Sequence, residues 1–423
     1  MFVVNVNLIL ILQLELNGDM NNVTFMVKKP DCIRMKTPSP NAVYLLACLQ
    51  IMRSSPAHTC SKMSIFKGPF HQCAKLSKLE VIKTFGYKNK LKQPALHSNT
   101  QLKSEYGSLP GVYASKSIQQ LITHCQSKGR NGLIEEYFEL KSAEPAMDFR
   151  TSKLPENMSK NRYADVLCLD VSRVILKGES YESDYINANY VDGFDHKKAY
   201  ISTQGPLEHT VKDQWRLIFQ ENVRVIVMTT KLAERGRIKC DAYWPLDPLE
   251  TVDYGKIKVV NLGIANKGDY QITLLEATHK ETKEVRHIKH LQYLSWPDQG
   301  VPADSSSFLE FLFEVRKAQL DFTADINLKL HSTKPPIIVH CSAGIGRTGT
   351  FIAIDIALHM YETTSKVNIE RIVKNIRRQR AFSIQMPDQY LFCHLALIQY
   401  AIKMGKVESS PDFKKILLGH SKF

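Results

Sequence analysis

A cysteine lies between a short apolar run and a glycine-rich turn in the last third of the chain. The run Ile337–Val339 is typical of a buried strand, and the apolar stretch Phe351–Tyr361 after the turn is typical of a buried helix. Cys341 is therefore expected at the end of a strand, in a loop that leads into a helix N-terminus. Such a loop can turn consecutive backbone N–H groups toward an anion, and the helix dipole adds positive potential.

The chemistry expected of this loop is nucleophilic attack on a bound anion. The positive field favours the thiolate form of Cys341, which is the reactive nucleophile. Gly344 and Gly346 permit the backbone angles and the close approach that an anion cradle needs. Arg347 presents a planar fork that matches two phosphoryl oxygens, and the Thr348 hydroxyl can donate a proton to the sulfur as it leaves.

The string from His340 to Thr348 resembles the catalytic loop of the protein tyrosine phosphatases. A structural cysteine beside a turn is the simpler alternative, but it does not explain the whole string. The resemblance implies a phosphate-binding loop, supported by His340, that consists of Ser342, Ala343, Gly344, Ile345, Gly346 and Arg347.

A second motif, Trp296-Pro297-Asp298, precedes this loop in the sequence. Its prolines and Gly300 favour a stiff segment that moves as a unit, with Trp296 as a supporting residue. The resemblance implies that Asp298 protonates the leaving tyrosyl oxygen and then takes a proton from the attacking water.

Four further residues are assigned to the substrate pocket. Tyr163 can stack on a substrate ring and set a depth that phosphotyrosine spans and phosphoserine does not, although packing on a helix edge is its alternative. Asp165 can accept hydrogen bonds from the substrate backbone. The resemblance implies that Gln385 holds the water that hydrolyses the intermediate, and Gln389 is assigned to the same region.

Two charged residues are expected to assist the catalytic groups. Glu234 can pair with Arg347 and orient its fork. Lys239 can approach Asp298 when that segment closes, or it is an ordinary surface lysine.

The pattern of elements predicts an α/β (α+β) protein with a twisted, mixed central β-sheet flanked by helices, and the resemblance implies the cysteine-phosphatase fold. The sequence predicts helices over Ile118–Cys125 and Leu133–Leu140, and another that opens at a capping box of Ser307 with Glu310. It predicts an exposed loop over Leu320–Lys334. The strings Asp184–Asn189 and Thr203–Pro206 also resemble the tyrosine phosphatase family. Four other strings are most similar to one non-receptor branch, which carries an N-terminal CRAL-TRIO lipid-binding domain that is not evident here: Asp165–Asp170, Val227–Thr230, Leu294–Trp296 and Gln379–Gln385.

Charge and composition divide the chain unevenly. The 423 residues carry a formal net charge of +14, and residues 1–110 hold 14 Lys and Arg against 5 Asp and Glu. We predict that residues 1–114 are a basic, mostly disordered extension, that residues 115–406 form the catalytic domain and that residues 407–423 are a loose tail. The extension either associates weakly with an acidic membrane surface or is simply solvated, and the sequence favours the second alternative.

The expected partners are phosphotyrosine-containing proteins and no nucleic acid. The nine cysteines lack the spacing of a disulfide framework, and thiolate chemistry needs a reducing compartment, so we expect a cytoplasmic protein. We also expect a monomer that uses no metal and no cofactor. Two other functions stay open: a phosphoinositide phosphatase, disfavoured by neutral residues inside the loop, and a non-catalytic phosphotyrosine-binding module, which would not need Cys341, Asp298 and Arg347 together.

Overall fold

A computed structural model describes residues 115–143, 147–178, 183–325 and 334–408, together with four short strands nearer the N-terminus. The chain divides into two compact units, residues 1–96 and 97–423. In the first unit, a four-stranded sheet is formed by β1 (Leu14–Glu15), β2 (Thr24–Val27), β3 (Ser64–Lys67) and β4 (Gln72–Lys75). The rest of residues 1–114 and residues 409–423 lie outside the described part, so the predictions for the extension and the tail stay predictions.

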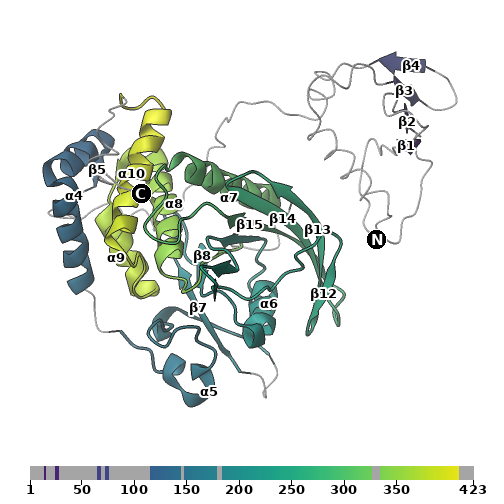
Figure 1. Ribbon diagram of the computed structural model, residues 1–423, viewed down its shortest axis with the longest axis horizontal. Helices are drawn as coiled ribbons and strands as arrows, with labels where there is room; N and C mark the ends of the chain where they lie inside the picture. The colour runs from purple at the N-terminus through teal and green to yellow at the C-terminus, as the bar shows by residue number, and fades with distance from the viewer. Residues whose placement is uncertain are drawn as a thin grey trace. The chain divides into compact units, whose positions relative to one another are not determined.

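A nine-stranded mixed sheet forms the centre of the second unit (Figure 1). Its central strands run parallel to one another: β15 (Val285–Tyr293), β9 (Val225–Met228), β16 (Ile337–His340) and β8 (Tyr200–Thr203). Antiparallel strands extend both edges: β14 (Tyr270–His279), β13 (Ile257–Asn266) and β12 (Thr251–Tyr254) beyond β15, and β7 (Tyr185–Val191) and β6 (Arg173–Ile175) beyond β8. The predicted mixed sheet is confirmed.

Helices cover both faces of this sheet, and alternate residues of the central strands explain why. Val225 and Val227 of β9 belong to one hydrophobic core, whereas Ile226 and Met228 belong to a second core on the opposite face. The first core is covered by α4 (Ile118–Ser142), α7 (Ser306–Asp325), α8 (Gly346–Thr364), α9 (Ile369–Gln379) and α10 (Pro387–Lys403). The second is covered by α6 (Val211–Gln220). None of the helices in the described ranges is long and apolar enough to cross a membrane.

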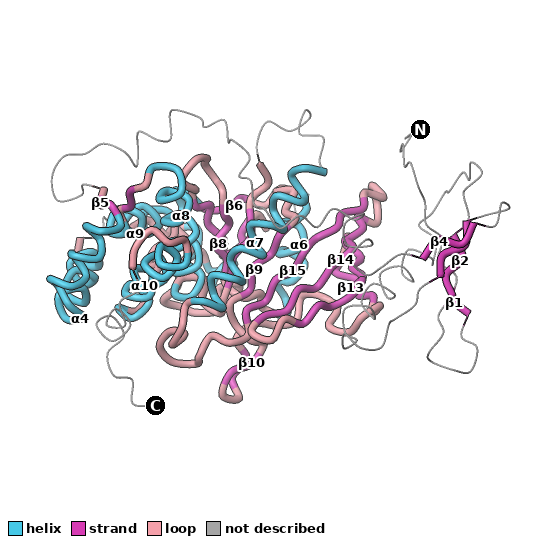
Figure 2. The backbone as a smooth tube through the Cα atoms, turned by 90° about the horizontal axis from the view of Figure 1, so that it is seen from above, coloured by secondary structure: helices cyan, strands magenta, loops and turns pink. Residues whose placement is uncertain are grey.

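The smaller elements complete the second unit. They are the short helix α5 (Pro155–Met158), the hairpin of β10 (Ala233–Glu234) with β11 (Arg237–Ile238), and the pair of β5 (Lys116–Ser117) with β17 (Lys366–Val367). Figure 2 shows the β10 hairpin projecting from the body of this unit.

Two local predictions from the sequence are wrong. Ser307 does not cap a helix: α7 begins at Ser306, and the Ser307 hydroxyl is hydrogen-bonded to Tyr293 Oη at 2.8 Å. The segment expected as a loop from Leu320 to Lys334 is instead helical as far as Asp325, and residues 326–333 of it lie outside the described part. The two helices predicted near residue 130 are segments of α4, which bends where Gly129 has φ 59°.

Candidate active site

The loop between β16 and α8 surrounds the sulfur of Cys341. Cys341 follows β16 directly, is buried, and accepts a hydrogen bond on Sγ from Gly344 N–H at 3.2 Å. Backbone N–H groups from outside the loop donate to the carbonyls of Ser342 and Ile345, at 2.9 Å each. A peptide carbonyl and the N–H of the next residue point in opposite directions. Because these carbonyls accept hydrogen bonds from outside the loop, the loop N–H groups are free to face the cavity.

A buried arginine holds the same loop from behind. Arg380 has no exposed surface and donates to the carbonyls of Ala343 and Gly344 at 3.1 Å each. Its other hydrogen bonds go to the Oδ1 atoms of Asn187 (2.7 Å) and Asn189 (2.9 Å) on β7. Sequence reasoning assigned no role to Arg380, because all four partners lie far from it along the chain, the two asparagines almost two hundred positions away, and no local pattern reports them.

Gly344 is required by the shape of this loop. Its φ of 72° is in the left-handed region, and a Cβ placed there would overlap the carbonyl of Thr203 on β8. The loop therefore packs directly on the sheet, which fixes its height above the end of β16.

Arg347 is held by a carboxylate on the β10 hairpin. Its guanidinium donates two hydrogen bonds to Glu234, at 2.6 and 2.9 Å, and one each to the carbonyls of Thr229 and Pro297, both at 3.3 Å. Burial raises the pKa of Glu234, but its hydrogen bonds with Arg347 and the charge of that residue outweigh burial and hold the pKa below its usual value. The fork is thereby oriented, and it also touches the segment that carries Asp298.

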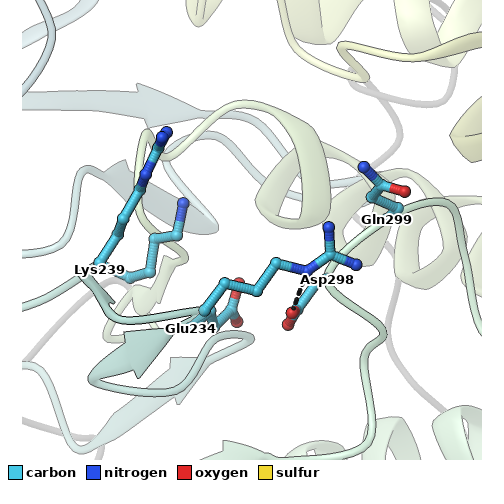
Figure 3. Close-up of a pocket in the computed structure, with 6 residues that line it drawn as sticks. Glu234, Lys239, Asp298 and Gln299 are labelled. Atoms are coloured by element: carbon cyan, nitrogen blue, oxygen red, sulfur yellow. Dashed lines mark hydrogen bonds and ion pairs between the residues drawn. The ribbon is translucent and has the colours of Figure 1, made fainter.

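Asp298 faces Arg235 in this structure. Its Oδ2 accepts a hydrogen bond from Arg235 Nε at 2.8 Å, the contact marked by a dashed line in Figure 3. Lys239 lines the same cavity, but its side chain has no hydrogen bond or ion pair with the residues that the structure describes. The approach of Lys239 to this carboxylate was expected only when the segment closes, and it stays a prediction; Arg235 was not assigned from the sequence.

Tyr163 is fixed at the cavity by a short hydrogen-bond chain. The Ser342 hydroxyl donates to the carbonyl of Lys239 at 2.8 Å, which leaves its oxygen to accept from Tyr163 Oη at 2.7 Å. Asp165 is exposed and lines the cavity nearby. The ring of Tyr163 is therefore held in place before any substrate arrives.

Gln389 positions the backbone of Gln385. Its Oε1 accepts hydrogen bonds from the N–H groups of Gln385 (2.9 Å) and Met386 (3.2 Å). From the other side, Tyr137 Oη of α4 donates to the carbonyl of Gln385 at 2.6 Å. The Gln385 side chain itself is exposed and lines the cavity, whereas Gln389 is largely buried beneath it.

Two supporting residues lie behind the sulfur. His340 is buried, with Nε2 hydrogen-bonded to Tyr243 Oη at 2.6 Å and Nδ1 to the carbonyl of Cys341 at 3.1 Å. Burial lowers the pKa of His340 to about 4, so the ring is neutral near pH 7. The buried Thr348 hydroxyl has no hydrogen-bond partner within the described residues, so it does not contact the Cys341 sulfur in this structure. The hydrogen bond to the sulfur comes from Gly344 N–H instead.

Most of the residues assigned from the sequence meet at one cavity of about 540 Å³. Those that line it are Tyr163, Asp165, Glu234, Lys239, Asp298, Cys341, Ser342, Ala343, Gly346, Arg347, Gln385 and Gln389. Those outside its lining are Trp296, His340, Gly344, Ile345 and Thr348. Five further residues also line it and were not assigned to the site, because none of them carries a recognisable chemical signal: Val166, Thr230, Gln299, Gly300 and Met386.

One other cluster in the described ranges has the spacing of metal ligands. His124, Glu136 and Glu370 bring their ligand atoms within 4.8 Å of one another, away from the cavity. Lys116 already pairs with Glu370 at 3.2 Å and Lys128 with Glu136 at 3.6 Å, so lysines offset the charge that would attract a cation. None of these residues takes part in the cavity around Cys341.

Comparison with known proteins gives consistent matches. Residues 157–399 match the family model described as Protein-tyrosine phosphatase. Human Tyrosine-protein phosphatase non-receptor type 9 is 44% identical over 308 residues, which cover 72% of this chain and 52% of that protein. Tyrosine phosphatase-like protein J1 of Microplitis demolitor bracovirus is 37% identical over 295 residues, covering 69% of this chain and 98% of that protein. The chain thus spans about half the length of the non-receptor type 9 relative.

Proposed function

This chain belongs to the protein-tyrosine phosphatase family, and on that premise we propose that it hydrolyses phosphotyrosine in proteins through a cysteinyl-phosphate intermediate. The observation that best supports the proposal is the single cavity lined by Cys341, Arg347 and Asp298. It combines a nucleophile, an anion-binding fork and an acid within reach of one substrate group.

In the first step the Cys341 sulfur attacks phosphorus, so that an S–P bond forms while the bond from phosphorus to the tyrosyl oxygen breaks. Asp298 gives its proton to the departing oxygen. Arg347 and the loop N–H groups hold the three equatorial oxygens, on which charge is spread in the transition state. These donors are fixed before the reaction by Glu234 and Arg380, as transition-state stabilisation by preorganised dipoles requires.

In the second step water attacks phosphorus and the S–P bond breaks, returning the thiolate and releasing phosphate. Gln385 orients this water, and the Asp298 carboxylate accepts its proton. The hydrogen bonds from Tyr137 and to Gln389 hold the Gln385 backbone at the cavity, which supports that role.

The two other functions are weaker fits to the same cavity. A phosphoinositide phosphatase would need cations inside the loop for additional phosphates, but Ser342, Ala343 and Ile345 are neutral. A binding module would not need an acid beside the nucleophile. Phosphotyrosine selectivity is expected from the depth set by Tyr163.

Residues 115–406 are the catalytic domain in this proposal, acting as a monomer in the cytoplasm on phosphotyrosine-containing proteins. Phe382 stacks on Phe149, with ring centroids 6.3 Å apart, where a smaller residue would leave space for a second phosphate. No preference for tandem phosphotyrosines is therefore expected.

Phosphate release from matched phosphotyrosine and phosphoserine peptides tests the proposal. We expect release from phosphotyrosine alone, abolished by Cys341→Ser and slowed by Asp298→Ala. No release by a folded protein would refute the enzyme and leave a binding module. Equal release from both peptides would refute the role of Tyr163.

A further inference from the structure

Three aromatic side chains form a buried, hydrogen-bonded row behind the catalytic loop. The Oη atom of Tyr243 lies 2.9 Å from Nε2 of His290 on β15 and 2.6 Å from Nε2 of His340 on β16. His340 Nδ1 continues the row to the Cys341 carbonyl at 3.1 Å. None of the three residues has exposed surface, so water does not compete for these hydrogen bonds. The row therefore connects β15 with the backbone of the nucleophile.

The position of each proton follows from the carbonyl at the end of the row. A carbonyl oxygen only accepts, so His340 carries a proton on Nδ1. Burial lowers the pKa of His340 to about 4, so its ring is neutral near pH 7 and its Nε2 is an acceptor. The Tyr243 hydroxyl therefore donates to His340, and its oxygen accepts from Nε2–H of His290.

The far end of the row agrees with this assignment. Burial lowers the pKa of His290 to about 3, so this ring is neutral too, and its Nδ1 has no hydrogen-bond partner among the described residues. A proton on that Nδ1 would have no acceptor, and Nε2 would then compete for the single Tyr243 proton. The ring of Trp244 stacks on His290, with centroids 4.2 Å apart, and holds it in this orientation. All three hydrogen bonds thus donate in one direction, toward Cys341.

We propose that His290 is a positioning residue for the nucleophile, which acts through Tyr243 and His340 to polarise the Cys341 carbonyl and so increases the share of Cys341 present as thiolate. Hydrogen bonds that donate in one direction strengthen one another, so removing the first donor weakens the last one. The inference rests on the proposed function, in which this thiolate attacks phosphorus.

Other ionisable groups near the sulfur set the background for this effect. Arg347 and Asp298 line the cavity together with Cys341, and electrostatic interactions also link Cys341 with Arg380 and Cys240. All of these side chains remain in place when His290 is replaced, so any change in the thiolate share is measured against the same surroundings.

The test measures the alkylation of Cys341 by iodoacetamide, which reacts with the thiolate, in the full chain as a function of pH. Mass spectrometry of the peptide that contains Cys341 gives the rate without any need for turnover. His290→Leu removes the first donor, whereas His290→Gln keeps an N–H group near the place of Nε2. We expect the His290→Leu profile to move up by about half a pH unit, which makes alkylation about threefold slower on its acid side and leaves the high-pH plateau unchanged. His290→Gln should restore the wild-type profile.

Two further variants separate the row from general damage to the fold. Tyr243→Phe removes only the hydroxyl and should produce a shift of its own, to which His290→Leu adds nothing in the double variant. His394→Leu removes another fully buried histidine, on α10, and should leave the profile unshifted.

An unshifted profile in Tyr243→Phe or His290→Leu protein, or additive shifts in the double variant, would overturn the proposal. A lower rate at every pH, plateau included, would also contradict it, because that result indicates a damaged loop. Hydrolysis of p-nitrophenyl phosphate is measured separately on the same proteins. Its absence in the wild type would refute the phosphatase function, while the alkylation profiles still decide the role of His290.

Discussion

Replacing Glu234 with alanine is expected to reduce both stability and turnover, because Glu234 positions Arg347. The side chain of Glu234 is almost fully buried and accepts two hydrogen bonds from that guanidinium. The hydroxyl of Thr230 donates to the same carboxylate at 2.9 Å. Alanine removes all of these acceptors and leaves a cation with no nearby counter-charge.

The size of the effect follows from this burial. Removing one partner of a buried ion pair costs about 3 to 5 kcal/mol of unfolding free energy. We expect the lower end, about 3 kcal/mol, because the Arg347 side chain keeps 14% of its surface exposed at the cavity and water can solvate it. Turnover should fall roughly a hundredfold, the typical cost when a group that positions the substrate shifts by about 1 Å.

Urea unfolding and steady-state kinetics with p-nitrophenyl phosphate measure the two effects. Glu234→Gln keeps the shape and one acceptor but loses the charge, so its losses should be intermediate. Glu281→Ala removes an exposed carboxylate that pairs with Lys256 at 3.4 Å, and its unfolding free energy should stay within about 0.5 kcal/mol of wild type. Wild-type turnover in folded Glu234→Ala protein would show that Arg347 is oriented without this carboxylate.

Two further perturbations test the loop and the core. Gly344→Ala should abolish turnover, because the new Cβ would overlap the Thr203 carbonyl and force the loop off the sheet; a fully active variant would contradict this packing. Burial lowers the pKa of His290 to about 3 and that of His340 and His394 to about 4. The folded protein keeps these histidines neutral, whereas the unfolded chain binds protons on them below their usual pKa near 6.5. The unfolding free energy should therefore fall as pH drops below 6.5, by roughly 2 kcal/mol per histidine at pH 5. Urea titrations at pH 7 and pH 5 measure this, and equal stabilities would contradict it.

The sequence was most informative where chemistry and local structure share one stretch of chain. The strand before Cys341 and the helix after it are both apolar, so the glycine-rich loop between them could be placed without knowing the rest of the fold. Glu234 was expected to pair with Arg347 because a carboxylate can accept hydrogen bonds from the guanidinium and orient its fork. The hydrogen bonds between them agree with that expectation.

Sequence reasoning is least informative where several neighbouring residues offer the same chemistry. Arg235, Arg237 and Lys239 are all cations, and Arg235, which lies in a turn with positive φ, is the one that pairs with Asp298 in this structure. Nothing in the local sequence reports that turn geometry. The start of α7 is a similar case, because Ser305, Ser306 and Ser307 are equally good caps and tertiary contacts select among them.

The hydrogen bond from Tyr137 to the carbonyl of Gln385 bears on where the chain can be shortened. Tyr137 belongs to α4, which ends before residue 157, where the match to the family model begins. A protein trimmed to residues 157–399 would keep the nucleophile, the arginine, the acid and the hydrogen bond from Gln385 N–H to Gln389, but it would lose the hydrogen bond from Tyr137 to the Gln385 carbonyl. We expect such a protein to form the cysteinyl-phosphate and to release it slowly. The residues that carry out the first step thus occupy a shorter stretch of chain than the residues needed to release phosphate efficiently.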